Sequence, residues 1–530
     1  MSEWWKSAVI YQVYPRSFQD DNGDGIGDLS GVTRRLPYIA SLGVDVIWLS
    51  PFFKSPMNDM GYDISDATDV DPLFGDLADF DEMLAASHAL GLKVIIDQVP
   101  SHTAEVHDWF AQSRSAKEGP KSDWYVWVDA KKDGTPPNNW LSVFGGPAWS
   151  WEPRRKQYYL HSFLSSQPQL NFHNEEVVQA TLDGMQFWLD RGVDGFRLDS
   201  INYPYFDPQF RDNPPEPEAT EDDWVNLYNV QRHQFDKTQP ENLKFLERVR
   251  SLVDGYPGCM LVGEVGEGRR GAEIMRDYTA ENRLHMAYSF EMLGPDYTPE
   301  HFAKCVGGFF DGSSVGWPCW AFSNHDVERH AGRWGNENFA NDVAKQAIAL
   351  MVSLEGTKCL YQGEELGQVE TDLEYSEIID PPGLKFWPEY KGRDGCRTPM
   401  VWDSTASNAG FSSQDPWLPI KPAQELRSVN IQEDDPNSVL VHYRTVLGFY
   451  AQSNCLRSGE TEFLEISEQL LVFNRSDAET LLCVFNLCDA AMHYSIPAMG
   501  ELIGPSNAHI DAKRIELPPF GWAWIAIDQE

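Results

Sequence analysis

Eight short apolar segments recur along the chain and constrain its fold more than any other feature. They cover residues 9–15, 44–51, 92–99, 193–199, 259–265, 287–292, 319–326 and 358–365. Each is nearly continuous in apolar character, as is typical of parallel strands that are buried on both faces. Segments with amphipathic helical spacing, such as 77–91 and 175–192, lie between them. Eight alternating units predict an α/β fold, a closed (β/α)8 TIM barrel, in preference to an open doubly wound sheet.

Two connections between the predicted strands are longer than a single helix requires. The first is rich in Trp, Pro, Gly and Asn, and it predicts a small domain inserted after the third strand. The second, residues 202–240, is rich in Pro and acidic residues and predicts a long mobile loop over the carboxyl end of the barrel. After the last barrel helix, alternating strands predict an all-β domain. The predicted domains are a barrel (1–101 and 173–454), an insertion (102–172) and a C-terminal antiparallel β domain (455–530).

The charge balance excludes several classes of partner. The chain has 42 Lys and Arg against 81 Asp and Glu, a formal net charge of −39, so a nucleic acid or an anionic membrane would be repelled. The start of the chain lacks the pattern of a signal peptide, and no apolar run reaches the length of a membrane span, which predicts a cytoplasmic protein. The eight cysteines form no CxxC pair, so zinc is not expected. We expect no organic cofactor, a small uncharged or cationic substrate, and a monomer or weak homo-oligomer.

Carboxylates end several of the apolar runs, where burial is costly unless the charge has a role. Asp199 and Glu264 end successive predicted strands, so their side chains would face each other at the carboxyl end of the barrel, where such folds carry their active sites. Two carboxylates flanking a bond are what glycoside hydrolysis requires. Arg197 lies two residues before Asp199 and would keep it ionised, whereas partial burial would keep Glu264 protonated. Asp326 supplies a third carboxylate that would bind sugar hydroxyls and stabilise positive charge at the ring.

Four motifs at these strand ends match a known family. The sequence reads DQVPSH at 97–102, GFRLD at 195–199, VGE at 262–264 and SNHD at 323–326. In this order the motifs make the chain resemble the α-amylase family of glycoside hydrolases, and most closely its α-glucosidase and oligo-1,6-glucosidase members. The resemblance covers nearly the whole chain. It implies that Asp199 is the nucleophile, Glu264 the general acid/base and Asp326 the residue that stabilises the transition state.

The resemblance also implies a set of substrate-binding residues. This set comprises Tyr62, Asp63, His102, Arg197, His325 and Arg393. In the glucosidase branch an arginine pairs with the aspartate of the GYD motif and grips the non-reducing end of the substrate, and we prefer Arg393 over Arg397 for this role. A site closed in this way trims single glucose units. Phe144 and Phe290 are candidates for the next subsite, with ordinary core packing as the alternative interpretation.

The segment 20–28 has the composition of a cation-binding loop. Asp20, Asn22, Asp24 and Asp28 lie at alternating positions with glycines between them, as in loops that wrap a hard cation with oxygen ligands. The backbone carbonyl of Ile26 would complete the set. The family resemblance implies Ca²⁺ or Mg²⁺ here, remote from the catalytic residues and therefore structural.

Three positions depart from the family pattern or refine it. Gln169 replaces an acidic residue in a motif that usually reads QPDLN, and Ser101 replaces the usual Asn before His102. Ser200 follows the nucleophile, where α-1,6-preferring relatives carry Val and α-1,4-preferring ones carry a small residue. The resemblance therefore implies a preference for α-1,4 links, as in maltose.

Together these features predict a retaining, exo-acting α-glucosidase that acts on short α-glucosides and transfers glucose as a side activity. A glucosyltransferase or sucrose-acting isomerase of the same family is the alternative, since all would form the same glucosyl-enzyme intermediate. A non-catalytic relative is a more distant alternative, because such relatives lack the catalytic carboxylates and carry a membrane helix.

Overall fold

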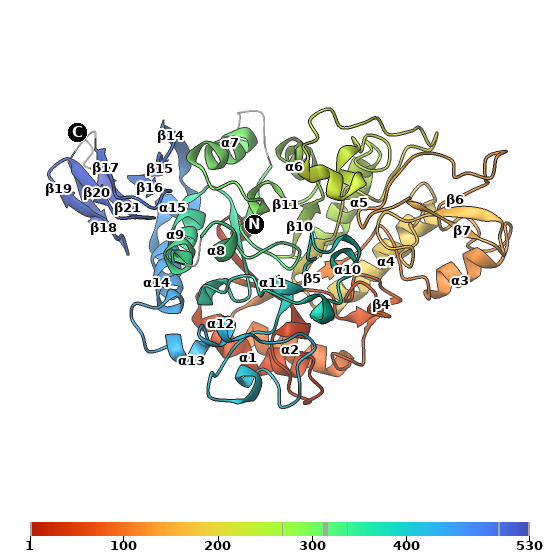
Figure 1. The fold of residues 1–530 in the computed structure, drawn as a ribbon, viewed down its shortest axis with the longest axis horizontal. Helices are drawn as coiled ribbons and strands as arrows, with labels where there is room; N and C mark the ends of the chain where they lie inside the picture. The colour runs from red at the N-terminus through yellow and green to blue at the C-terminus, as the bar shows by residue number, and fades with distance from the viewer. Residues whose placement is uncertain (1–2, 268, 311–315, 336–337, 497–498, 528–530) are drawn as a thin grey trace.

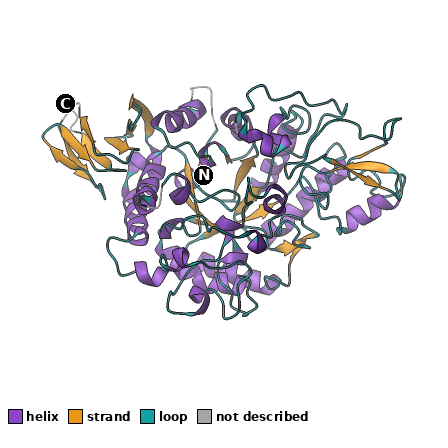
Figure 2. Ribbon diagram, viewed as in Figure 1, coloured by secondary structure: helices purple, strands orange, loops and turns teal. Residues whose placement is uncertain are grey.

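Eight parallel strands form the centre of the molecule in the computed structural model, which describes residues 3–267, 269–310, 316–335, 338–496 and 499–527 (Figures 1 and 2). They are β1 (Val9–Val13), β2 (Val46–Leu49), β5 (Lys93–Gln98), β9 (Gly195–Leu198), β10 (Met260–Val265), β11 (Met286–Ser289), β12 (Cys319–Ala321) and β13 (Thr357–Tyr361). The strand order is β11-β10-β9-β5-β2-β1-β13-β12, and a parallel bridge between Ala287 and Pro318 joins its two ends. The predicted barrel is confirmed, and each predicted apolar run contributes one strand.

Helices alternate with these strands and cover the outside of the barrel. The longer ones are α1 (Leu29–Ser41), α2 (Leu77–Ala89), α4 (Glu175–Arg191), α5 (Asn242–Val253), α6 (Gly271–Thr279), α7 (Pro299–Phe309), α9 (Ala340–Ser353) and α14 (Val439–Gln452). Local signals fix their ends: Asn174 caps the start of α4, and Gly192 ends it in the left-handed conformation. Trp188 of α4 is fully buried and packs against Phe52, Phe53 and Phe80. The helices are therefore held by their apolar faces against the barrel.

The first residue of β9 must be glycine. Gly195 has φ +136°, and a Cβ atom there would lie 1.8 Å from the carbonyl oxygen of Met260 on β10. Any side chain would push the two strands apart. These are the strands that carry Asp199 and Glu264 at their ends, so this close approach sets the distance between the strands at the site.

A small region separates β5 from β9. It contains α3 (Asp108–Ser115) and a three-stranded sheet of order β6-β8-β7, formed by β6 (Trp127–Val128), β7 (Trp149–Glu152) and β8 (Gln157–Leu160). An aromatic cluster around Trp140 and Trp149 fills it, and Phe206 and Phe210 of the segment 202–240 join the cluster. We call this segment the strap. It contains the 3-10 helices η3 (Asp222–Val225) and η4 (Leu227–Val230), and its aromatic residues bind it to the inserted region.

The chain ends in two antiparallel sheets at one side of the barrel (Figure 1). One has the order β14-β15-β16-β21-β18, from β14 (Glu460–Ile466), β15 (Leu470–Ser476), β16 (Thr480–Asn486), β21 (Trp522–Ile527) and β18 (Gly500–Ile503). The other has the order β17-β20-β19, from β17 (Met492–Ser495), β20 (Arg514–Leu517) and β19 (His509–Asp511). Buried Trp524 donates to the Ser353 hydroxyl of α9 across 2.8 Å, which joins this region to the barrel. The predicted C-terminal β domain is confirmed.

Shorter elements complete the fold. They are the hairpin β3 (Phe53–Lys54) and β4 (Asp66–Val70), the 3-10 helices η1 (Trp4–Ser7), η2 (Pro15–Ser17), η5 (Glu291–Leu293), η6 (Glu364–Leu366), η7 (Tyr375–Glu377) and η8 (Ser407–Gly410), and the helices α8 (His330–Arg333), α10 (Pro381–Phe386), α11 (Asp394–Arg397), α12 (Pro422–Glu425), α13 (Val429–Gln432) and α15 (Asn454–Ser458). Among the described residues, no helix combines the length and the apolar character needed to cross a membrane.

Candidate active site

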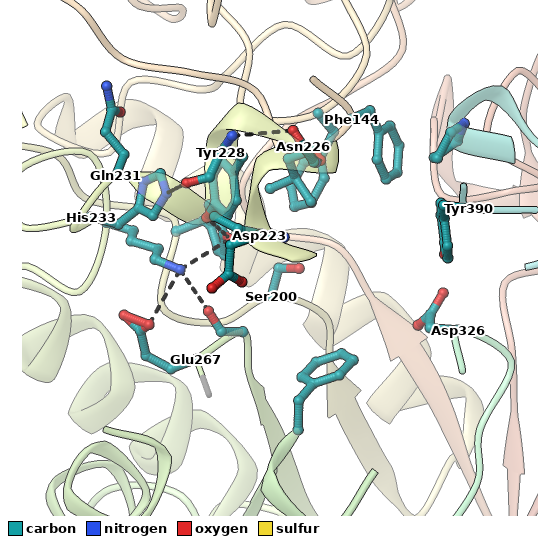
Figure 3. Close-up of a pocket in the computed structure, with 18 of the residues that line it drawn as sticks. Phe144, Ser200, Asp223, Asn226, Tyr228, Gln231, His233, Glu267, Asp326 and Tyr390 are labelled. Atoms are coloured by element: carbon teal, nitrogen blue, oxygen red, sulfur yellow. Dashed lines mark hydrogen bonds and ion pairs between the residues drawn. The ribbon is translucent and has the colours of Figure 1, made fainter. Parts of the chain in front are cut away.

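A cavity of about 1250 Å³ opens at the carboxyl ends of the barrel strands. Its floor is formed by strand-end residues, among them Asp199, Glu264 and Asp326. Its walls come from outside the barrel: Phe144 of the inserted region, residues of the strap, and Tyr390 beyond α10 (Figure 3). Tyr62, His102, Ser200, Phe290, His325 and Arg393 also line it, so most of the residues expected from the sequence meet in one place.

One guanidinium links the carboxylates of three neighbouring strands. Arg197 on β9 is fully buried, and its Nη1 lies 2.7 Å from Asp97 and 2.8 Å from Asp199. Its Nη2 lies 2.6 Å from Glu264 Oε1. The hydroxyl of Tyr288, on β11, accepts from this guanidinium and donates to Glu264 across 3.1 Å. A buried charge network of this kind is stable only when each partner is satisfied, and it fixes the positions of both candidate catalytic carboxylates.

The environments of Glu264 and Asp199 give the two carboxyl groups different pKa values. Burial raises the pKa of Glu264 to about 7, against the lowering effect of Arg197, with Asp199 and Asp326 raising it further. Burial raises the pKa of Asp199 to about 6, while Arg197 lowers it. The backbone N–H of Ser200 donates to Glu264 Oε2 across 2.9 Å. Asp199 therefore ionises before Glu264, so the pair can hold one charge and one proton near neutral pH.

Asp326 has the opposite balance. Burial would raise its pKa, but His325, Arg393 and Arg397 outweigh it and hold the pKa well below its usual value. Arg397 Nη2 lies 3.0 Å and Arg393 Nη1 3.2 Å from Asp326 Oδ1. This carboxylate is thus ionised throughout the physiological range. A fixed negative charge beside a sugar favours the positive charge that develops at the anomeric carbon.

Two histidines and a tyrosine form one wall of the cavity. The ring of Tyr62 stacks on His325 at 5.1 Å between centroids and 3° between planes, and its hydroxyl donates to Asp97. Gln12 Nε2 lies 2.7 Å from His325 Nδ1, so an amide donor there leaves the proton on Nε2, which is 3.2 Å from Asp326. Burial lowers the pKa of His325 to about 3 and of His102 to about 4, so both rings are neutral donors or acceptors.

The expected partner of Arg393 was wrong. Arg393 Nη2 lies 2.8 Å from Asp59, not Asp63, and 2.7 Å from Asp380. Asp63 is buried outside the cavity lining, where it accepts from the backbone N–H groups of Asn58 and Asp59 and from the Ser55 hydroxyl. Its role is to fold the loop that carries Asp59. Phe144 lies over Arg393, with 4.9 Å from the guanidinium to the ring centre, and Phe290 also lines the cavity.

Gln169 and Ser101, the two residues that depart from the family motifs, form hydrogen bonds with their immediate neighbours. Gln169 is buried outside the cavity lining, where it donates to the Tyr203 carbonyl across 3.0 Å and accepts from Ser162 across 3.1 Å. An uncharged amide therefore satisfies this position without an ion pair. The Ser101 hydroxyl lies 2.9 Å from His102 Nδ1, so it orients the ring where the family has Asn. Neither change reaches the carboxylates.

The loop 20–28 holds its oxygen atoms in tight turns. Asp20 accepts from the N–H groups of Gly23 and Gly25 at 2.6 and 2.8 Å, and Asp28 accepts from those of Asp21 and Asn22 at 3.0 Å. Among the described residues, no three or more His, Cys, Asp or Glu side chains are arranged to hold a metal ion by themselves. Coordination here would need the Asn22 amide and Ile26 carbonyl oxygens as well. The donors are all hard oxygens with a second lone pair, which fits Ca²⁺ or Mg²⁺ in chemical type.

Several cavity residues were not identified from the sequence. The strap supplies Tyr228, whose hydroxyl lies 2.7 Å from that of Tyr203, and His233, whose ring stacks on Tyr228 at 3.7 Å (Figure 3). Buried Lys237, at the end of the strap, donates to the carbonyl of Gly266 across 2.7 Å, two residues beyond Glu264. The sequence around Lys237 is a polar loop without a periodic hydrophobic pattern, so nothing in it indicates that this lysine is buried. Asp59 had a weak signal, as a second aspartate four residues before Asp63 of the GYD motif.

Comparisons with known proteins agree with this geometry. Residues 12–459 match the family described as "Alpha amylase, catalytic domain". The chain is 54% identical to a probable alpha-glucosidase of Rhizobium meliloti, over 98% of this chain and 96% of that protein. It is 36% identical to an oligo-1,6-glucosidase of Heyndrickxia coagulans, over 94% of each.

Solved structures give the same answer. A crystal structure described as an alpha-glucosyl transfer enzyme matches with a TM-score of 0.97 and 50% identity, over the full length of both chains. The fold of this chain is thus the fold of that solved structure over its full length. The chain belongs to the α-amylase family of glycoside hydrolases, in the branch of the α-glucosidases and oligo-1,6-glucosidases.

Proposed function

We propose that this glycoside hydrolase is a retaining, exo-acting α-glucosidase that releases α-glucose from the non-reducing end of short α-glucosides. One observation carries the proposal: Arg197 contacts both Asp199 and Glu264 at the floor of a single cavity. Retaining enzymes hold their two carboxyl groups roughly 5 Å apart, and two groups that share one guanidinium are held close together. The pKa order of the pair matches the tasks of nucleophile and acid.

The reaction follows from these assignments. Asp199 attacks the anomeric carbon while Glu264 gives its proton to the leaving oxygen, and the glycosidic bond breaks. Glu264, now ionised, takes a proton from water, and the water oxygen displaces Asp199. Two inversions give net retention of the α configuration. Asp326 stabilises the positive charge of the sugar ring in both steps.

The closed end of the cavity supports exo action. Arg393, Asp59 and Phe144 together form a wall beside Asp326, and the guanidinium of Arg393 is nearly buried. Buried paired charges of this kind can hydrogen-bond the hydroxyls of a terminal glucose, as a site that binds the non-reducing end requires. Ser200 lies beside Glu264 in the lining and, as a small residue, supports a preference for α-1,4 links.

Transfer of glucose to a second sugar is the alternative outcome of the same intermediate. The similarity to a structure described as an alpha-glucosyl transfer enzyme favours it as at least a side activity. Product analysis at high maltose concentration decides between them. Glucose as the sole product at every concentration would argue against transfer.

Anomer-resolved NMR tests the main proposal. Glucose release from maltose, isomaltose and sucrose is followed for the wild type and for Asp199→Ala. We expect α-glucose to appear first, fastest from maltose, and no release by the variant. Early β-glucose, or full activity of Asp199→Ala, would show that the mechanism is wrong.

We also propose that the loop 20–28 binds Ca²⁺ or Mg²⁺ as a structural ion. A ligand at 100 times its Kd adds about 2.7 kcal/mol of stability. Calorimetry should therefore show a lower Tm in EDTA that is restored by Ca²⁺ or Mg²⁺. Asp24→Ala, at an exposed loop position, should remove this dependence. A Tm that is the same in EDTA and in metal would rule the ion out.

A further inference from the structure

A tight turn of the inserted region covers one side of the cavity. Leu141 and Pro147 pair as an isolated antiparallel bridge, and within it the N–H of Ser142 donates to the Gly146 carbonyl across 2.9 Å. The N–H of Phe144 donates to the Ser142 hydroxyl across 3.1 Å. These bonds fix the shape of the turn, but they do not fix its position relative to the barrel.

The position of this turn matters because Phe144 stands at its tip. Its ring lies 4.9 Å from the guanidinium of Arg393, which in turn holds Asp59 and Asp326. Figure 3 shows Phe144 and Tyr390 together on the side of the cavity where Asp326 lies. A shift of the turn would move Phe144 off Arg393 and open the closed end of the cavity.

Two donors from different parts of the chain reach the backbone of the turn. Asn226, in the strap, donates from Nδ2 to the Val143 carbonyl across 2.7 Å. Lys385, in α10, donates from Nζ to the Gly145 carbonyl across 2.6 Å. These two carbonyls flank Phe144 in the sequence. Within the inserted region, the N–H of Val143 also donates to the Ser162 carbonyl across 2.9 Å. Asn226 and Lys385 therefore add two anchors from outside this region, one from the strap and one from α10.

Close packing supports the contact with α10. Gly145 has φ +83°, and a Cβ atom there would lie 2.5 Å from Cζ of Phe386. Only glycine allows α10 to approach the turn this closely and still leave the carbonyl exposed to Lys385. Asn226 is constrained as well, because its Oδ1 accepts from the N–H of Tyr228 across 3.1 Å, which aims the amide nitrogen at the turn.

We propose that Asn226 and Lys385 are positioning residues that clamp the turn 142–146 and so keep Phe144 on Arg393. The clamp decides how tightly the cavity selects a substrate with a free non-reducing end. This inference rests on the proposed exo-acting function and deepens it. Neither residue touches the reacting atoms; both act through the turn.

Three variants test the clamp. Asn226→Asp keeps the acceptor for Tyr228 but replaces the donor to Val143 with a charged oxygen. Lys385→Met keeps an unbranched apolar side chain of similar size but removes the donor. Lys385→Arg keeps a donor and should behave as the wild type. Lys117→Met is the matched control, since Lys117 pairs with exposed Asp129 and neither residue lines the cavity. Substrates are 4-nitrophenyl α-maltoside and the same compound with O4 and O6 of its terminal glucose blocked by an ethylidene group.

The loss of one hydrogen bond changes an equilibrium about twofold to tenfold. We expect Asn226→Asp and Lys385→Met to raise KM for the free substrate by such a factor with kcat nearly unchanged, as loss of uniform binding does. The ratio of kcat/KM for the blocked substrate to kcat/KM for the free substrate should rise in both variants relative to the wild type, and their Tm should equal that of the wild type. The clamp would be overturned if both variants had the KM of the wild type and the same ratio of activities on the blocked and the free substrate. A fall in kcat at constant KM would overturn it as well. If the wild type itself cleaves the blocked substrate well, the exo-acting function fails instead.

Discussion

At the scale of single residues, the site assigns opposite protonation states to neighbouring carboxylates. Asp199, Glu264 and Asp97 all contact Arg197, yet Asp326, held by Arg393 and Arg397, has its pKa lowered where the others have theirs raised. Burial acts on all four in the same direction. The difference comes from the number of cations beside each group. Arg393 and Arg397 both contact Asp326, although Arg393 also pairs with Asp59 and Asp380, whereas the other three carboxylates share the single guanidinium of Arg197.

The pH dependence of the reaction follows from this division. Below about 6 Asp199 gains a proton and cannot attack; above about 7 Glu264 loses its proton and cannot act as an acid. The profile of kcat/KM should be bell-shaped with its maximum between these values, and the two limbs belong to the coupled pair. Glu264→Gln should lower kcat about 10²- to 10⁴-fold. Rates that stay constant up to about pH 9 would contradict the assignment of Glu264.

Ser200 tests the linkage preference. It has φ +43° and lines the cavity beside Glu264, so a larger side chain there narrows the space for the leaving group. Ser200→Val should raise cleavage of isomaltose relative to maltose, and Ser200→Ala should keep the ratio of the wild type. Because a β-branched residue at positive φ is strained, Tm is measured alongside. An unchanged isomaltose-to-maltose ratio in a folded Ser200→Val protein would remove the linkage argument.

At the scale of elements, the barrel depends on close contact between β9 and β10. Gly195→Ala should lower stability by about 1–3 kcal/mol from backbone strain alone, and the clash with Met260 adds to this cost. Gly184→Ala in α4 is the matched control, because a Cβ there meets nothing within 4 Å and alanine favours the helix by about 0.5–1 kcal/mol. Calorimetry should show Tm falling in the first variant and rising slightly in the second. Equal Tm values would show that β9 tolerates a side chain.

The sequence predicts strands better than it predicts the loops between them. Each buried strand needs a run of apolar residues, so all eight were visible, whereas the two-residue strand β3 is too short to show a pattern. The error over Asp63 has a similar cause. Positive φ at Met57 and Met60 turns the chain so that Asp59 faces Arg393, and no local pattern reports such a turn. Likewise, the contacts of Tyr228 and Lys237 depend on where the strap returns to the barrel.

At the scale of the whole molecule, charge acts on stability. A net charge of −39 repels itself in the compact state, and salt screens this repulsion as the Debye length falls from about 30 Å at 0.01 M to about 3 Å at 1 M. Tm should therefore rise by several degrees with added NaCl. Choline chloride should have the same effect if screening is the cause. A Tm that falls steadily with either salt would mean that surface ion pairs outweigh the repulsion.

The floor and the walls of the cavity come from different parts of the fold. In the proposed mechanism, bond breaking depends on residues at the carboxyl ends of the barrel strands, whereas the walls come from the strap, the turn 142–146 and the segment around α10. Insertions and substitutions in these walls leave the floor intact, so selection can exchange one sugar acceptor for another without rebuilding the catalytic apparatus. Substrate specificity can therefore evolve through changes in these wall loops, while the residues of the cavity floor and the reaction that they catalyse stay the same.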